Sequence, residues 1–134
     1  MKKEEKQQLT YNKDFRDAWK NAWQGIKYGI KSQRNIQIQV VIGVLVAILG
    51  FITKLSKMEW MILSISIFLV ILAEMLNTAV ETTVDLYTEE YHPKAKIAKD
   101  VGAGAVVIAV INSTIIGVIL FGDKLINIIA MNIK

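Results

Sequence analysis

The chain has 134 residues, of which 53% are hydrophobic, and a formal net charge of +4 at pH 7. This length predicts one domain, residues 1–134, and the apolar fraction exceeds the roughly 45–50% typical of soluble domains. With no cysteine and one histidine, one chain cannot form a disulfide, a thiolate metal site or a site with several histidine ligands. The basic residues flank apolar segments and form no separate basic domain, so we expect no nucleic-acid partner.

The first predicted element is an amphipathic helix at residues 13–34. Apolar residues recur there at helical spacing, at Phe15, Ala18, Trp19, Ala22, Trp23, Ile26 and Ile30. Most Lys and Arg side chains of this segment lie off that stripe. Tryptophan on one side and cations on the other are typical of a helix that lies in the membrane interface. The alternative is that the stripe packs against the other helices.

Three longer apolar segments follow, and we expect membrane helices at residues 36–53, 58–86 and 97–121. A membrane span needs about 20 residues, which the third segment supplies by itself and the first two reach with their flanks. Residues 112–114 of the third segment are polar, and such residues can hydrogen-bond across helices in a bundle. The sequence therefore predicts an all-α membrane protein with an N-terminal interfacial helix and three transmembrane helices.

The basic residues also predict the orientation of these helices. Twelve of the sixteen Lys and Arg residues lie in residues 1–34 and 94–99, and the other four lie at the opposite ends of the helices. Lys and Arg accumulate in cytoplasmic loops. We therefore expect a multi-pass protein of the cell membrane, with its N-terminus and the 82–100 region in the cytoplasm.

The trailing part of the second membrane helix carries polar residues on one face. Because successive residues of an α-helix advance 100°, Glu74, Asn77, Glu81 and Asp85 fall within a sector of about 80°. A helix over residues 58–86 is about 43 Å long, whereas the hydrocarbon core is about 30 Å thick. We therefore expect these four residues, the acidic stripe, to run from the inner membrane edge into the cytoplasm.

Three interpretations of the acidic stripe stay open from its residues alone. It could hold Mg²⁺, which proteins usually bind through one or two carboxylates together with substrate phosphates. It could relay protons or cations in a small transporter. Its acids could also be paired structurally with Arg34, Lys94, Lys96 or Lys99. A P-loop and the motifs of protein kinases are both absent from the sequence.

The segment AEMLNTAVETTVDLYTEEYHPKAKIAKDVGAGAV, residues 73–106, resembles the signature of the small integral-membrane lipid kinases of prokaryotes, the diacylglycerol kinase and undecaprenol kinase family. It contains the pattern E-x-x-N-[ST]-A-x-E-x-x-V-D, followed by E-Y-H and A-K-D. The stretches EYHP and IKSQRN are more similar to the Gram-positive, undecaprenol kinase-like branch. The resemblance implies a homotrimer that uses ATP and Mg²⁺ to phosphorylate a membrane lipid alcohol, undecaprenol first and diacylglycerol as the alternative.

The resemblance also implies roles for individual residues. Glu74 matches the catalytic base that accepts the proton of the lipid hydroxyl, and Ala103 matches a second position beside the lipid substrate. Asn77 and Lys99 match other catalytic positions, and Glu81 matches a ligand of the metal. The expected ATP-binding residues are Glu81, Asp85, Glu90, Tyr91, His92, Lys99 and Asp100.

One position departs from the family pattern. Members usually carry a glutamate before the first span as a second metal ligand, and here Gln33 of KSQRN stands at that place. An amide oxygen can coordinate Mg²⁺ but brings no charge to the site. We therefore expect Gln33 to be a weaker metal ligand than the usual glutamate.

Overall fold

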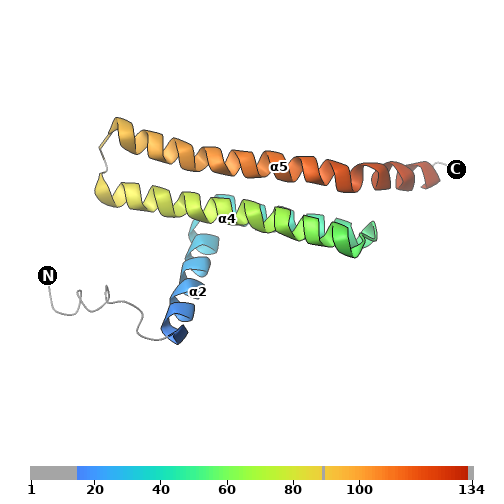
Figure 1. Ribbon diagram of the computed structural model, residues 1–134, viewed down its shortest axis with the longest axis horizontal. Helices are drawn as coiled ribbons and strands as arrows, with labels where there is room; N and C mark the ends of the chain where they lie inside the picture. The colour runs from blue at the N-terminus through green and yellow to red at the C-terminus, as the bar shows by residue number, and fades with distance from the viewer. Residues whose placement is uncertain (1–14, 89, 133–134) are drawn as a thin grey trace.

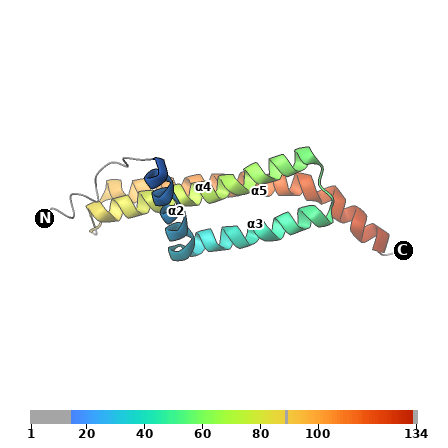
Figure 2. The same cartoon turned by 90° about the horizontal axis from the view of Figure 1, so that it is seen from below.

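The computed structural model describes residues 15–88 and 90–132. Within them the backbone forms four α-helices and no strand: α2 (Phe15–Ser32), α3 (Arg34–Ile52), α4 (Lys57–Tyr87) and α5 (Pro93–Asn132). The last three run alongside one another, whereas α2 lies across them (Figures 1 and 2). Each of these three is long and apolar enough to cross a membrane, which confirms the predicted all-α fold.

Helix α2 confirms the predicted amphipathic helix, although residues 13 and 14 of that prediction lie outside the described residues. Asp17 in its first turn and Lys31 in its last complement the helix dipole. Trp19 and Trp23 are 69% and 53% exposed, and the Lys27 ammonium lies 5.9 Å from the Trp23 ring centroid. The apolar stripe is therefore largely unpacked within one chain, as expected of a surface that faces lipid.

The junction between α2 and α3 is a single extended residue. Gln33 has φ −108° and ψ 110°, and its side chain makes no capping hydrogen bond. The Gln37 side chain instead donates to the Ile30 carbonyl at 3.0 Å, at the end of α2. Gly29 lets α2 pack closely on α3 and α4. An added Cβ there would lie 3.2 Å from Ile36 Cδ1 and 3.8 Å from Met75 Cε.

The connection between α3 and α4 is a tight turn. Lys54 adopts φ 54°, in the left-handed region. Ser56 then caps α4 in a capping box: the Glu59 N–H donates to its hydroxyl, and the Ser56 N–H donates to the Glu59 carboxylate at 2.7 Å. Beside this turn lies a small apolar core, made by Leu55, Leu63, Leu120 and Phe121.

Helices α4 and α5 form the most closely packed pair and run antiparallel (Figure 1). The Ser66 hydroxyl donates to the Ser113 hydroxyl at 2.8 Å. For Ser113, this confirms the prediction that a polar residue of the third segment hydrogen-bonds to another helix. Asn77, eleven residues after Ser66 on α4, contacts Gly102, eleven residues before Ser113 on α5. The two helices therefore stay in one register from the apolar core to the acidic stripe.

The observed bounds of α3 and α4 agree with the predicted helices to within two residues at each end. Helix α5 is longer than the predicted helix 97–121, since it begins at Pro93 and ends at Asn132. The prediction stopped where the apolar run meets Asp123 and Lys124. In this extension the Lys124 ammonium lies 3.1 Å from a carboxylate oxygen of Glu59, which places the Lys124 charge against the start of α4.

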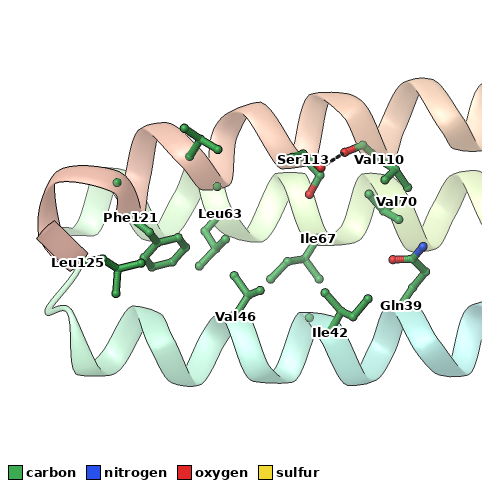
Figure 3. Close-up of a pocket in the computed structure, with 15 residues that line it drawn as sticks. Gln39, Ile42, Val46, Leu63, Ile67, Val70, Val110, Ser113, Phe121 and Leu125 are labelled. Carbon is green, nitrogen blue, oxygen red and sulfur yellow. Dashed lines mark hydrogen bonds between the residues drawn. The ribbon is translucent and has the colours of Figure 1, made fainter. Parts of the chain in front are cut away.

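Between α3 and the α4–α5 pair lies an apolar groove (Figure 3). Val46 and Ile42 of α3 face Ile67 of α4 across it, and Phe121 and Leu125 of α5 lie at one end. Gly43 brings α3 close to α4, because an added Cβ would lie 2.9 Å from a methyl group of Ile67. The apolar half of the structure is thus held by close packing of large side chains on small ones.

Candidate functional site

The acidic stripe lies on one face of α4, which is buried at Glu74 and becomes exposed toward the end of the helix at Asp85. Glu74 and Asn77 are 5% and 7% exposed, Glu81 is half-buried, and the Asp85 side chain is 57% exposed. Thr78 is buried beside them, and its hydroxyl donates to the Glu74 carbonyl at 3.0 Å. A stripe that grades from buried to exposed along one helix is what the sequence predicted for a helix that emerges from a membrane.

Glu74 is a buried carboxylate without a cationic partner among the described residues. Its side chain makes no hydrogen bond there either. Ionisable groups at membrane depth are expensive and usually belong to a functional site. Structural ion pairing therefore does not account for Glu74.

Asn77 links the stripe internally and contacts α5. Its amide nitrogen donates to Glu81 Oε1 at 2.9 Å, one helical turn further on. Its amide oxygen is buried without a partner in the described residues. That oxygen lies against Gly102, where an added Cβ would come within 2.5 Å of it. Glycine at position 102 is therefore what allows Asn77 to occupy this place.

The structure pairs Lys99 and Asp85, as one of the sequence interpretations expected. The Lys99 ammonium lies 2.5 Å from a carboxylate oxygen of Asp85, across from α5 to α4. Asp100 instead pairs with Lys96, one turn earlier on α5. Both pairs are well exposed, so each contributes little stability and can exchange for another charged ligand at small cost.

The loop between α4 and α5 carries three of the residues expected to bind ATP. Tyr91 and Glu90 are exposed, and Thr88 Oγ1 accepts a hydrogen bond from the Glu90 N–H. The His92 carbonyl accepts from the Lys96 N–H at 3.0 Å, which begins α5. A groove of about 690 Å³ opens here, and it is lined by Thr83, Val84, Tyr87, Thr88, His92, Lys94, Ala95 and Ala98.

Two predicted site residues stand apart from this arrangement. Gln33 is half-buried at the α2–α3 junction, and no hydrogen bond links its side chain to Glu81 among the described residues. Ala103 is exposed on α5, next to Gly102. The same part of the chain contains no cluster of three or more His, Cys, Asp or Glu residues that could hold a metal ion.

The donor set still fits a magnesium ion that is bound together with a nucleotide. Mg²⁺ commonly takes one or two carboxylates and completes its shell with substrate phosphates and water. Glu81 supplies one such carboxylate, because Asn77 occupies one of its oxygens and the other makes no hydrogen bond in the described residues. A cluster of three acidic residues is therefore not required to hold Mg²⁺ together with a nucleotide.

Sequence reasoning did not assign Thr78 or Gly102 to the site. A buried threonine on a helix has no distinctive local pattern. Gly102 has no distinctive local pattern either, because its neighbour Asn77 is far away in sequence. A long-range pair of this kind leaves no periodic signal in a single sequence.

Comparison with known proteins adds to this geometry. A family model described as prokaryotic diacylglycerol kinase matches residues 20–121. An undecaprenol kinase of Bacillus subtilis (strain 168) is 50% identical over 78 residues, which cover 58% of this chain and 63% of the relative. A diacylglycerol kinase of Synechocystis is 49% identical over 57 residues, 42% of this chain and 33% of the relative.

A diacylglycerol kinase of Escherichia coli (strain K12) is 46% identical over 50 residues, 37% of this chain and 41% of the relative. The matched segments thus span less than two thirds of these curated relatives. The family model itself covers most of the chain, from the second turn of α2 to Phe121 in α5, and includes the whole acidic stripe. The chain therefore belongs to the prokaryotic diacylglycerol kinase family.

Proposed function

We propose that this protein is a lipid kinase that transfers the terminal phosphoryl group of ATP to the hydroxyl of a membrane lipid alcohol. The observation that carries this proposal is the buried carboxylate of Glu74, which has no ion-pair partner within residues 15–88 and 90–132 and lies on the same helix face as Glu81. In such a pair, one carboxylate can contact the lipid and the other can contact the nucleotide. The names of the matched relatives favour a kinase over the transporter interpretation.

Glu74 is proposed to act as the general base. The lipid hydroxyl oxygen attacks the terminal phosphorus of ATP, the bond to ADP breaks, and Glu74 takes the hydroxyl proton. Its burial favours this role, because a carboxylate shielded from water and from cations stays available to accept a proton. Asn77 is proposed to hold Glu81 in place through the hydrogen bond between their side chains.

The nucleotide is proposed to lie at the exposed end of the acidic stripe. Glu81 would hold Mg²⁺ together with ATP phosphate oxygens, and the ion would neutralise charge on the phosphates. Lys99 would exchange its exposed partner Asp85 for a phosphate, and Asp100 lies one residue further along α5. His92, Tyr91 and Glu90 stand at the neighbouring loop, where the 690 Å³ groove offers space for the rest of ATP.

The acceptor is proposed to be undecaprenol, with diacylglycerol as the alternative. The relative with 50% identity is named an undecaprenol kinase, and other matched relatives are named diacylglycerol kinases. We propose a homotrimer in the cell membrane, as the family resemblance implies. The excess of basic residues at the site end favours a cytoplasmic N-terminus and active site.

A side-by-side acceptor assay tests the proposal. The purified protein in mixed micelles is given radiolabelled ATP, Mg²⁺ and equal mole fractions of undecaprenol or diacylglycerol. We expect label in undecaprenyl phosphate at the higher rate. Faster labelling of diacylglycerol would overturn the choice of acceptor. If neither lipid gains label while circular dichroism shows an intact helical protein, the kinase proposal fails.

The proposed role of Gln33 has its own test. Gln33→Glu adds a charged ligand oxygen at the position where the family usually has one, so the Mg²⁺ concentration for half-maximal rate should fall several-fold. Gln24→Glu, at an exposed residue of α2 that makes no hydrogen bond among the described residues, is the matched control and should leave this concentration unchanged. An unchanged or higher Mg²⁺ requirement in Gln33→Glu would remove Gln33 from the metal site.

A further inference from the structure

Asn112 is an amide at the centre of the membrane-spanning part of α5. It lies twelve residues from Asp100 and eleven from Asp123, with no charged residue between these two. These separations correspond to about 18 and 16 Å of helix, so Asn112 lies near the middle of a hydrocarbon core about 30 Å thick. It is exposed, and its side chain makes no hydrogen bond among the described residues. Lipid tails cannot satisfy it, and an unsatisfied polar group there is costly.

Asn112 lines a groove of about 720 Å³ between α4 and α5. Unlike the groove of Figure 3, it has no α3 residue in its lining, so it opens on another face of the α4–α5 pair. Its floor is made of small residues, namely Ala73, Ala98, Gly102, Ala105 and Ala109. Small residues let a second helix approach closely.

The rims of this groove are large apolar side chains that face outward. Leu72 and Leu76 on α4 are 54% and 59% exposed, and Val101 and Ile108 on α5 are 67% and 71% exposed. Asn77 lines the same groove, and its buried amide oxygen has no partner in the described residues. The groove therefore combines an apolar surface with two amides that have unused hydrogen-bonding capacity.

The polar groups of the α4–α5 groove indicate whether a lipid chain or a protein helix fills it. An acyl or isoprenoid chain would cover the apolar rims and leave Asn112 unsatisfied, whereas a helix can bring a polar group to it. All copies of one membrane protein share one orientation, so equivalent polar residues, including Asn112 itself, lie at equal depth in each copy. A second copy therefore carries polar groups at the depth of Asn112 simply because it has the same sequence and orientation.

We infer that a helix of a second copy of this chain packs in the α4–α5 groove, and that Asn112 hydrogen-bonds to that copy in the middle of the membrane. A single buried amide in an apolar helix interface fixes how the helices align, because a shifted alignment leaves it unsatisfied. Asn112 thereby sets the depth at which two copies meet. The inference rests on the oligomer proposed above, but it does not depend on the number of copies or on phosphoryl transfer.

The first test removes the amide and keeps the side-chain size. Asn112→Leu should raise the dissociation constant between copies about 3- to 20-fold, the range measured for hydrogen bonds between membrane helices. Sedimentation equilibrium in density-matched detergent measures this constant. The matched control is Thr114→Val, because the Thr114 hydroxyl already donates to the Val110 carbonyl of its own helix at 2.8 Å. Unchanged association in Asn112→Leu, or an equal loss in the control, would overturn the inference.

The second test locates the interface and does not depend on the behaviour of the leucine variant. Because the chain has no cysteine, Leu72→Cys and Val44→Cys each carry one thiol for a benzophenone photocrosslinker. Val44 is a comparable control, since it is 55% exposed on α3. Irradiation in native membranes should join copies of the protein through position 72 and leave position 44 attached to lipid. The reverse pattern, or lipid adducts alone at both positions, would place the contact elsewhere.

These outcomes are separate from those of the kinase assay. If copies fail to contact one another through this groove, a protein that phosphorylates lipid still supports the proposed function. If the protein phosphorylates no lipid, crosslinks at position 72 and weaker association of Asn112→Leu still support the interface.

Discussion

The two halves of the α4–α5 pair share one register but differ in the side chains that they bury. At one end, Leu63, Leu120 and Phe121 form an apolar core beside the α3–α4 turn, and Glu59 pairs with Lys124. At the other end, the helices bury Glu74 and Asn77, and the described residues do not supply either side chain with all its hydrogen-bond partners. Polar groups left unsatisfied are costly, so the apolar half, and not the acidic half, must supply most of the stability. Stability and chemistry should therefore be separable by mutation.

The largest expected effect is on activity, in the acidic half. Glu74→Gln removes the proposed base and keeps the side-chain shape, so the rate of lipid phosphorylation should fall about 10²- to 10⁴-fold. Glu59→Gln makes the same change at the other end of α4 and should leave the rate near that of the unmodified protein. Comparable rates for both variants would show that the acidic half has no special role.

The next effect is on stability, in the apolar half. Leu63 is 3% exposed, so Leu63→Ala should lower the free energy of unfolding by about 2–5 kcal/mol. Unfolding in mixed micelles, followed by circular dichroism, measures this change. Ile65→Ala, at a residue that is 65% exposed, is the control and should cost much less. Activity per folded molecule should be retained in both, and its selective loss in Leu63→Ala would contradict the separation.

Gly102 tests the contact between the helices within the acidic half. Gly102→Ala puts a methyl group 2.5 Å from the Asn77 amide oxygen, so Asn77 must move and its hydrogen bond to Glu81 must change. Misplacement of about 1 Å in a catalytic group can cost about 100-fold in rate, and we expect a loss of up to that size. Gly104→Ala is the control, because an added Cβ there meets nothing within 4 Å. Equal rates for the two variants would show that the Asn77 position is not critical.

The smallest effect is expected at the ion pair of the apolar half. Lys124→Met should lower the free energy of unfolding by about 1 kcal/mol or less, as is usual for pairs that stay partly hydrated. Lys57→Met is the control, since Lys57 lies near the same end of α4 and has no ion pair among the described residues. A loss of several kcal/mol would mean that this pair, and not the apolar core, holds the far end of α4 and α5 together.

Much of this arrangement could be predicted from local patterns. The 3.6-residue spacing of apolar residues predicts α2, and the apolar runs predict α3 and α4 closely. The acidic stripe needed only helix geometry, because its members are separated by three or four residues. Helix α5 extends beyond the predicted membrane segment to Asn132, and in that extension Lys124 pairs with Glu59, which is distant in sequence.

By itself, the sequence determined what depends on neighbours along the helix: the helices, the membrane-compatible runs, and the face that carries Glu74, Asn77 and Glu81. Only the tertiary structure decided which of these polar groups have partners. It pairs Lys99 with Asp85, leaves Glu74 without a cation in the part of the chain that the structure describes, and sets the Asn77 amide against Gly102. The physical reason is that an antiparallel register brings together residues far apart in the chain, and no local pattern in one sequence encodes that register.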